Sequence, residues 1–155
     1  MQKEQHPRQI FEQVIVRLKS GARAEAESLC REAITQDPGD VNFRALLGTI
    51  LAERNAFEEA EENLRHVIKV APGHARAHED LGTVLLNQSR ADEALPLLEK
   101  AVALMPKSAS AASKLAGALS ALGRTADAEA LRARATQLSP QQAKLEQATR
   151  LFAQG

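Results

Sequence analysis

Apolar residues recur at helical spacing along this chain, and the pattern of apolar and polar positions repeats after 34 residues. The clearest copy places Val41–His74 over Ala75–Ser108 without a gap. The matching landmarks are Leu47-Gly48 with Leu81-Gly82, Leu51 with Leu85, Ala60 with Ala94, Leu64 with Leu98, and Pro72 with Pro106. A self-match at a fixed period of this length indicates stacked repeats rather than one globular core.

The same frame extends over nearly the whole chain and predicts four repeats, at 7–40, 41–74, 75–108 and 109–142. Each repeat carries a proline near its end and an alanine at one position of its second half. These residues are Pro38, Pro72, Pro106 and Pro140, and Ala26, Ala60, Ala94 and Ala128.

The spacing of apolar residues predicts two helices in each repeat, an A helix followed by a B helix. We expect the first two pairs at these positions: Pro7 to about Lys19, about Arg23 to Thr35, Val41 to about Arg54, and about Phe57 to Val70. Ser139-Pro140 is typical of a helix start, so a last helix should run to about Ala153, with 143–155 as a cap. Residues 1–6 are expected to be a flexible N-terminus. The predicted fold class is all-α.

This arrangement resembles the tetratricopeptide repeat family, whose repeats carry Leu-Gly on the A helix, an alanine on the B helix and a closing proline. The chain departs from that pattern at Gln13-Val14 and Leu115-Ala116, and it has neither Trp nor Tyr. The resemblance implies a right-handed α-solenoid of four antiparallel helix pairs plus a C-terminal capping helix. It also implies a reason for Gly48 and Gly82, since a mid-helix glycine costs roughly 1 kcal/mol relative to alanine. The missing side chain would let the B helix of the same repeat lie close.

In this family the A helices line a concave groove that binds a peptide segment of another protein. Carrying the groove positions across gives a lining that is apolar in the first repeat, polar and charged in the middle, and small in the fourth. The residues expected to bind peptide are Phe11, Ile15, Leu18, Asn42, Thr49, Arg76, Glu79, Thr83, Asn87 and Lys114. Some relatives hold a peptide carboxylate in a basic clamp, but here Arg76 alone is basic in the corresponding slots. Chaperone C-terminal tails are therefore not the expected ligand.

The first A helix is expected to be rotated relative to the others. It has Gln13 and Arg17 where the others have core residues, and Phe11, Ile15 and Leu18 where the others face the groove. An exposed apolar ridge of this kind indicates an anchor for a partner or for a second copy of the chain. The alternative is that an end repeat packs with a different rotation.

Composition narrows the classes of partner. Twenty basic and twenty acidic residues give a formal net charge of zero, which argues against binding to nucleic acid or to anionic membranes. No apolar stretch is long enough for a membrane span, so we expect no membrane insertion. The chain has one cysteine and no secretory signal pattern, which favours the cytoplasm.

The residues that could carry chemistry are few. His74 and His78 lie one helical turn apart, but no cysteine or carboxylate completes a metal signature. Cys30 occupies an apolar position filled elsewhere by Leu64 and Leu98, so packing explains it. We find no phosphate-binding loop and no nucleophile elbow. We therefore expect no catalytic residue, no metal and no cofactor.

Three interpretations remain. The favoured one is a non-enzymatic scaffold or adaptor that binds a peptide segment of another protein in the A-helix groove. A second is a repeat module of a larger enzyme, such as a repeat-linked transferase. A third is a self-assembling structural protein that forms a homodimer through apolar residues of the first helix or through Leu151-Phe152.

Overall fold

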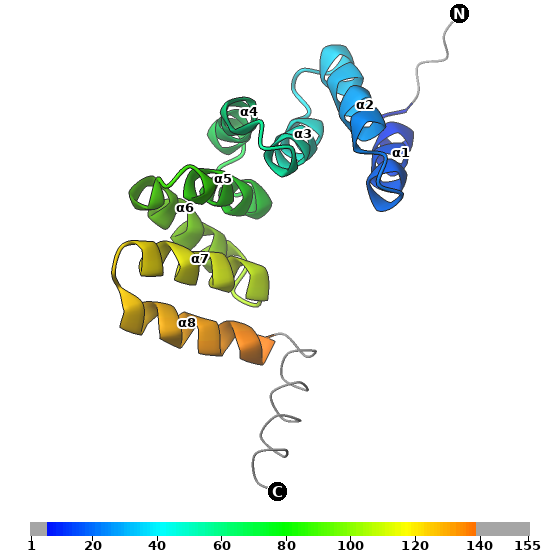
Figure 1. The fold of residues 1–155 in the computed structure, drawn as a ribbon. Coiled ribbons are helices and arrows are strands. Elements are labelled where there is room, and N and C mark those ends of the chain that lie inside the picture. Colours follow the sequence, from blue (N-terminus) through cyan, green and yellow to red (C-terminus); the bar gives the residue numbers. More distant parts are fainter. Residues whose placement is uncertain (1–5, 139–155) are drawn as a thin grey trace, which may run out of the picture. The chain divides into compact units, whose positions relative to one another are not determined.

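The computed structural model describes residues 6–138, and within that range the chain consists of α-helices without any strand. The helices are α1 (Pro7–Lys19), α2 (Arg23–Gln36), α3 (Val41–Glu53), α4 (Phe57–Val70), α5 (Ala75–Asn87), α6 (Ala91–Leu104), α7 (Ala109–Ala121) and α8 (Thr125–Leu138) (Figure 1). The all-α prediction is confirmed, and the bounds expected for the first four helices hold to within one residue. The expected last helix, from Pro140 to Ala153, lies outside the described residues, as do residues 1–5.

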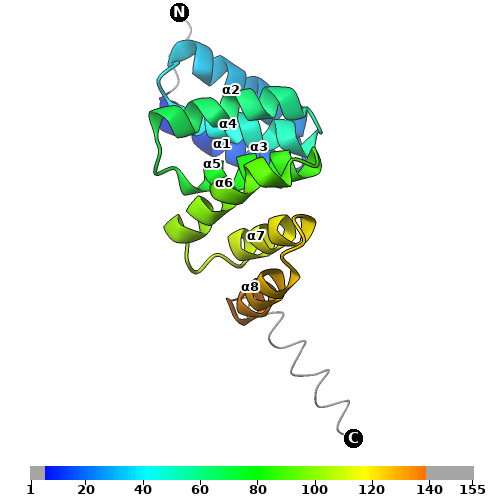
Figure 2. The same cartoon turned by 90° about the vertical axis from the view of Figure 1, so that its left-hand side faces the viewer.

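The chain forms two compact bodies, Met1–Asp80 and Leu81–Gly155, so that the boundary falls within α5. In the N-terminal body α1 packs on α2, α2 on α3, and α3 on α4. Its A helices, α1 and α3, lie on one side, while its B helices, α2 and α4, lie on the other (Figures 1 and 2). In the C-terminal body α6 packs on α7 and α7 on α8.

Each A helix begins in the same way, with a side chain that accepts a hydrogen bond from a backbone N–H of the first turn. The capping residues are spaced 34 apart: His6, Asp40, His74 and Ser108. Their acceptor atoms lie 2.8 to 3.3 Å from the donor nitrogens. Such a bond satisfies one of the N–H groups that a helix start leaves unpaired.

Each A helix also ends in the same way, with a residue in the left-handed region. These residues are Gly21 (φ 79°), Asn55 (61°), Ser89 (61°) and Gly123 (78°). The N–H of the following residue then donates to a carbonyl five positions back, as Ala56 does to Leu51 at 2.9 Å. This is the Schellman motif. The next helices α2, α4 and α6 start directly after it, and no side chain caps them.

Two glycines let paired helices approach closely, as the family resemblance implied. A β-carbon on Gly48 would lie 2.6 Å from Leu64 Cγ, and one on Gly82 would lie 2.5 Å from Leu98 Cγ. The first repeat has Val14 and Cys30 at the corresponding positions, and both are fully buried. The larger residue on α1 is thus matched by a smaller one on α2, which conserves packed volume.

The rotation expected for the first A helix is present. Ile10 and Val14 are buried, while Gln13 and Arg17 are exposed. The continuous exposed ridge predicted along this helix is only partly correct, because Ile15 and Leu18 are half-buried and Phe11 alone of the three is exposed. The burial of Ile10 and Val14 against α2 draws these two neighbours partly into the packed layer.

Candidate functional site

The A-helix face of the N-terminal body contains a charged cluster that joins α3 to α5. Asp80 is buried and accepts hydrogen bonds from Arg76 Nε at 2.9 Å and from Thr49 Oγ1 at 2.6 Å. Thr49 Oγ1 also lies 3.1 Å from the carbonyl of Ala45, but its single proton is best placed on the shorter, charge-assisted contact. The cluster fixes Arg76 at one edge, while 60% of its side chain stays exposed.

An aromatic contact joins α1 to α3 on the same face. The rings of Phe11 and Phe43 meet edge to face, with centroids 6.1 Å apart and planes at 66°. Phe43 is buried, whereas Phe11 is 37% exposed. Edge-to-face pairs of this kind add about 0.5–1.5 kcal/mol beyond the area they bury. The pair therefore holds an exposed aromatic surface in a fixed position.

The other residues predicted for this face vary in accessibility. Asn42 is exposed in the first turn of α3, where its backbone N–H donates to Asp40 Oδ1 at 2.8 Å. Glu79 is only 1% exposed, so its carboxylate lies inside the protein rather than on the surface. The structure thus places Phe11, Thr49 and Arg76 on a shared face built from α1, α3 and the start of α5.

Three of the predicted peptide-binding residues belong to the C-terminal body. Thr83 is half-buried and Asn87 exposed on α5, and Lys114 is half-buried on α7. On α7 a β-carbon at Gly117 would meet Leu86 Cδ1 at 3.9 Å, an ordinary contact. The small residue there leaves open space that a larger side chain would fill.

The groups considered for chemistry are held by other contacts. His78 is buried, and its Nε2 lies 2.8 Å from the carbonyl oxygen of Pro72, so that nitrogen carries the proton and donates it. His74 Nδ1 instead accepts from the backbone N–H of Ala77 at 3.1 Å. Burial, and then the charge of Glu27, raises the pKa of the Cys30 thiol to about 12. Within residues 6–138 no three His, Cys, Asp or Glu side chains are grouped as metal ligands.

An ion-pair network on the B-helix side was not predicted from the sequence. Arg31 Nη2 pairs with Glu27 at 2.9 Å and Arg31 Nη1 with Glu59 at 2.7 Å, which connects α2 to α4. Arg54, which follows α3, also pairs with Glu27. Burial raises the pKa of Glu27, but the hydrogen bonds and charges of Arg31 and Arg54 outweigh it and hold the pKa below its usual value. The same carboxylates raise the pKa of Arg31.

The sequence profile of the tetratricopeptide repeat matches residues 17–82 and 85–153. The two matches begin 68 residues apart (from 17 to 85), which is twice the 34-residue period. Together they cover most of the chain. The chain belongs to the tetratricopeptide repeat family. No match was found among curated proteins.

Solved structures of MamA resemble this tetratricopeptide repeat chain. A MamA structure from Desulfovibrio magneticus RS-1, spanning residue 41 to the end, is 25% identical, with a TM-score of 0.76. The match covers 86% of this chain and 76% of that one. A second structure of MamA is 18% identical, with a TM-score of 0.77 over 92% of this chain and 83% of that one. At that identity the second match shows the fold alone.

The family assignment supports the coarse functional class. The chain is a protein–protein interaction scaffold of the α-solenoid class, a fold typical of non-enzymatic binding proteins. None of the helices in the described part of the chain is long and apolar enough to cross a membrane.

Proposed function

We propose that the A-helix face of the N-terminal body binds a peptide segment of a partner protein. The observation that carries this proposal is the pair of contacts that join three A helices. Phe11 meets Phe43 between α1 and α3, and Thr49 donates to Asp80 between α3 and α5. A surface fixed in this way can bind without losing much conformational freedom, which lowers the cost of association.

The chemistry of this face defines the segment that fits it. Asp80 occupies Arg76 Nε, so the two terminal amino groups of the guanidinium remain for an acceptor. A carboxylate matches that planar pair of donors. The exposed edge of Phe11 offers an apolar contact. The expected ligand therefore combines an acidic side chain with an apolar or aromatic one.

Affinity capture with two point variants tests this function. Arg76→Ala removes the guanidinium and Phe11→Ser removes the exposed ring, so each should lose the proteins that the unaltered chain retains from a lysate. Arg65→Ala, on α4 of the opposite side, is the matched control and should retain them. If all three variants retain the same proteins as the unaltered chain, the A-helix face is not the binding site.

A second copy of the chain is one partner that this face could take. Sedimentation velocity on the purified chain separates that outcome, because Phe11→Ser would then convert a dimer to a monomer. A monomer at all concentrations would restrict the proposal to a different protein as the partner.

A further inference from the structure

A hollow lies on the B-helix side of the N-terminal body, away from the face discussed above. It is open to solvent, has a volume of about 320 Å³, and is enclosed by α2, α3 and α4. Leu47 and Ile34 supply its apolar surface, and Arg44, Asn63 and Glu62 supply polar atoms. This volume is at the lower end of the range of about 300–1,000 Å³ that is common for ligand pockets.

Two polar groups of the hollow lack partners of their own. Arg44 Nε is buried without any acceptor, and Arg44 Nη1 makes only a long contact, 3.5 Å, with Asn63 Oδ1. A buried donor left unsatisfied costs about 1–3 kcal/mol, so an incoming acceptor would be favoured here. Glu62 is exposed at the rim, and no ion pair or hydrogen bond holds its carboxylate among residues 6–138.

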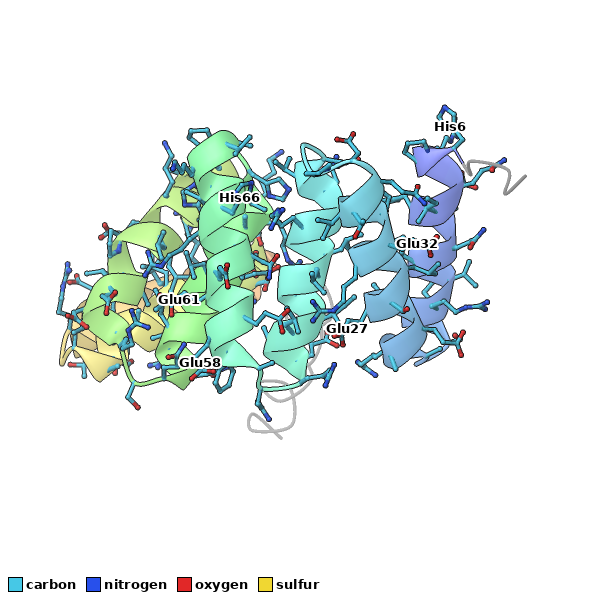
Figure 3. The ribbon with its side chains drawn as sticks, turned by 90° about the horizontal axis from the view of Figure 1, so that it is seen from above. His6, Glu27, Glu32, Glu58, Glu61 and His66 are labelled. Atoms are coloured by element: carbon cyan, nitrogen blue, oxygen red, sulfur yellow. The ribbon has the colours of Figure 1, made fainter. Side chains whose placement is uncertain are left out.

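The opposite charges around the hollow are already neutralised among themselves. Arg31 at one end pairs with Glu27 and Glu59, which leaves Glu62 as the rim charge that is not balanced. The two B helices add to this excess, since α2 has three Glu and two Arg, and α4 has four Glu, one Arg and one Lys. Several of these glutamates lie along the helices seen in Figure 3. A cationic ligand is therefore favoured over an anionic one.

This combination occurs at one place in the repeat frame. At the positions 34 residues further on, Arg44 is replaced by His78, Glu62 by Pro96 and Asn63 by Leu97. The next interval therefore lacks both the rim carboxylate and the side-chain amide. The hollow is a feature of this interval rather than a general property of the repeat.

We propose that this hollow binds a segment of a partner protein in which a lysine or arginine lies next to an apolar residue. The cation would pair with Glu62, and the apolar side chain would cover Ile34 and Leu47. A backbone carbonyl of the segment would accept from Arg44. The charge and the apolar surface select the opposite sequence character from the acidic segment expected at the A-helix face.

The test uses two fluorescein-labelled octapeptides, one alternating lysine with leucine and the other alternating glutamate with leucine. Fluorescence anisotropy with the full chain should show binding of the lysine peptide and not of the glutamate peptide. Glu62→Lys should weaken that binding by about tenfold or more. Glu32→Lys makes the same charge change on α2 outside the hollow, so it should have a much smaller effect.

Nuclear magnetic resonance gives the position of the bound peptide. The Arg44 Nε–H and the Asn63 side-chain amide should shift on titration, while Arg76→Ala and Phe11→Ser should leave the affinity unchanged. These two variants separate this site from the A-helix face, so either proposal can fail alone. Equal losses in Glu62→Lys and Glu32→Lys, equal binding of both peptides, unshifted Arg44 and Asn63 signals, or no binding would each overturn the proposal.

Discussion

Leu64 fills the space that a β-carbon on Gly48 would occupy, since Leu64 Cγ lies 2.6 Å from that position. This contact joins α3 to α4 within one repeat, and Gly82 and Leu98 reproduce it in the C-terminal body at 2.5 Å. The first repeat meets the same requirement with Val14 and Cys30. The helices of a pair therefore depend on the summed size of two residues rather than on glycine alone.

The first prediction follows from this relationship. Gly48→Ala should destabilise the chain by about 1–3 kcal/mol through overpacking, even though alanine improves helix propensity by roughly 1 kcal/mol. Urea denaturation measures the change. Gly48→Val should be worse, and combining it with Leu64→Cys, which copies the first repeat, should restore part of the loss. A double variant less stable than the sum of its single changes would contradict the volume argument.

The second prediction concerns the turn between the A and B helices. Ser89 adopts φ 61°, a conformation that glycine adopts in the corresponding turns at Gly21 and Gly123. Left-handed backbone costs a residue with a β-carbon about 1–2 kcal/mol, so Ser89→Gly should stabilise the chain by about 1 kcal/mol. The midpoint of urea unfolding would rise. Gly21→Ala is the converse control and should lower it.

The third prediction concerns the link between α3 and α5. Thr49→Val keeps the side-chain shape but leaves Asp80 Oδ2 without its 2.6 Å donor. Because Asp80 is buried, the loss should be about 1.5–3 kcal/mol of unfolding free energy, typical of a hydrogen bond to a charged group. Thr35→Val is the matched control, since its hydroxyl donates to the Arg31 carbonyl on an exposed helix surface. A similar loss in both variants would show that the interhelical bond has no special weight.

The fourth prediction concerns pH. The folded-state pKa of Glu27 is lowered, so the carboxylate contributes stability above its unfolded pKa and loses it as pH falls through the folded value. Unfolding free energy should therefore decline on acidification, and Glu27→Gln should reduce that decline. Glu32→Gln, an exposed neighbour on α2, should leave the pH dependence unchanged. Identical pH profiles in the unaltered chain and Glu27→Gln would contradict the assignment.

The sequence could predict whatever the 34-residue period carries. The helix bounds, the cap at Asp40, the close approach at Gly48 and the rotation of α1 all follow from aligned positions, because they depend on local chemistry. The period also holds the equivalence of Asn55 and Ser89 with two glycines, a signal from which the left-handed turns could have been found.

The accessibility of the candidate site could not be predicted in the same way. Glu79 was expected on the groove and is buried, and Ile15 is half-buried, because burial depends on neighbouring helices as well as on position within the repeat. The network of Arg31 with Glu27 and Glu59 also required three-dimensional packing of α2 against α4. Similar charges on successive B helices were a signal for it, although many pairings were compatible with the sequence.

The Schellman turns leave no slack between an A helix and its B helix, since Ala56 N–H is bonded to Leu51 within the same few residues that reverse the chain. The connections from a B helix to the next A helix are longer, as at residues 37–40. Extra residues inserted within a pair would break a bonded turn, whereas insertions between pairs would only lengthen an exposed connection. Length variation among related chains should accordingly fall between helix pairs, and engineered tags or labels will be best tolerated there.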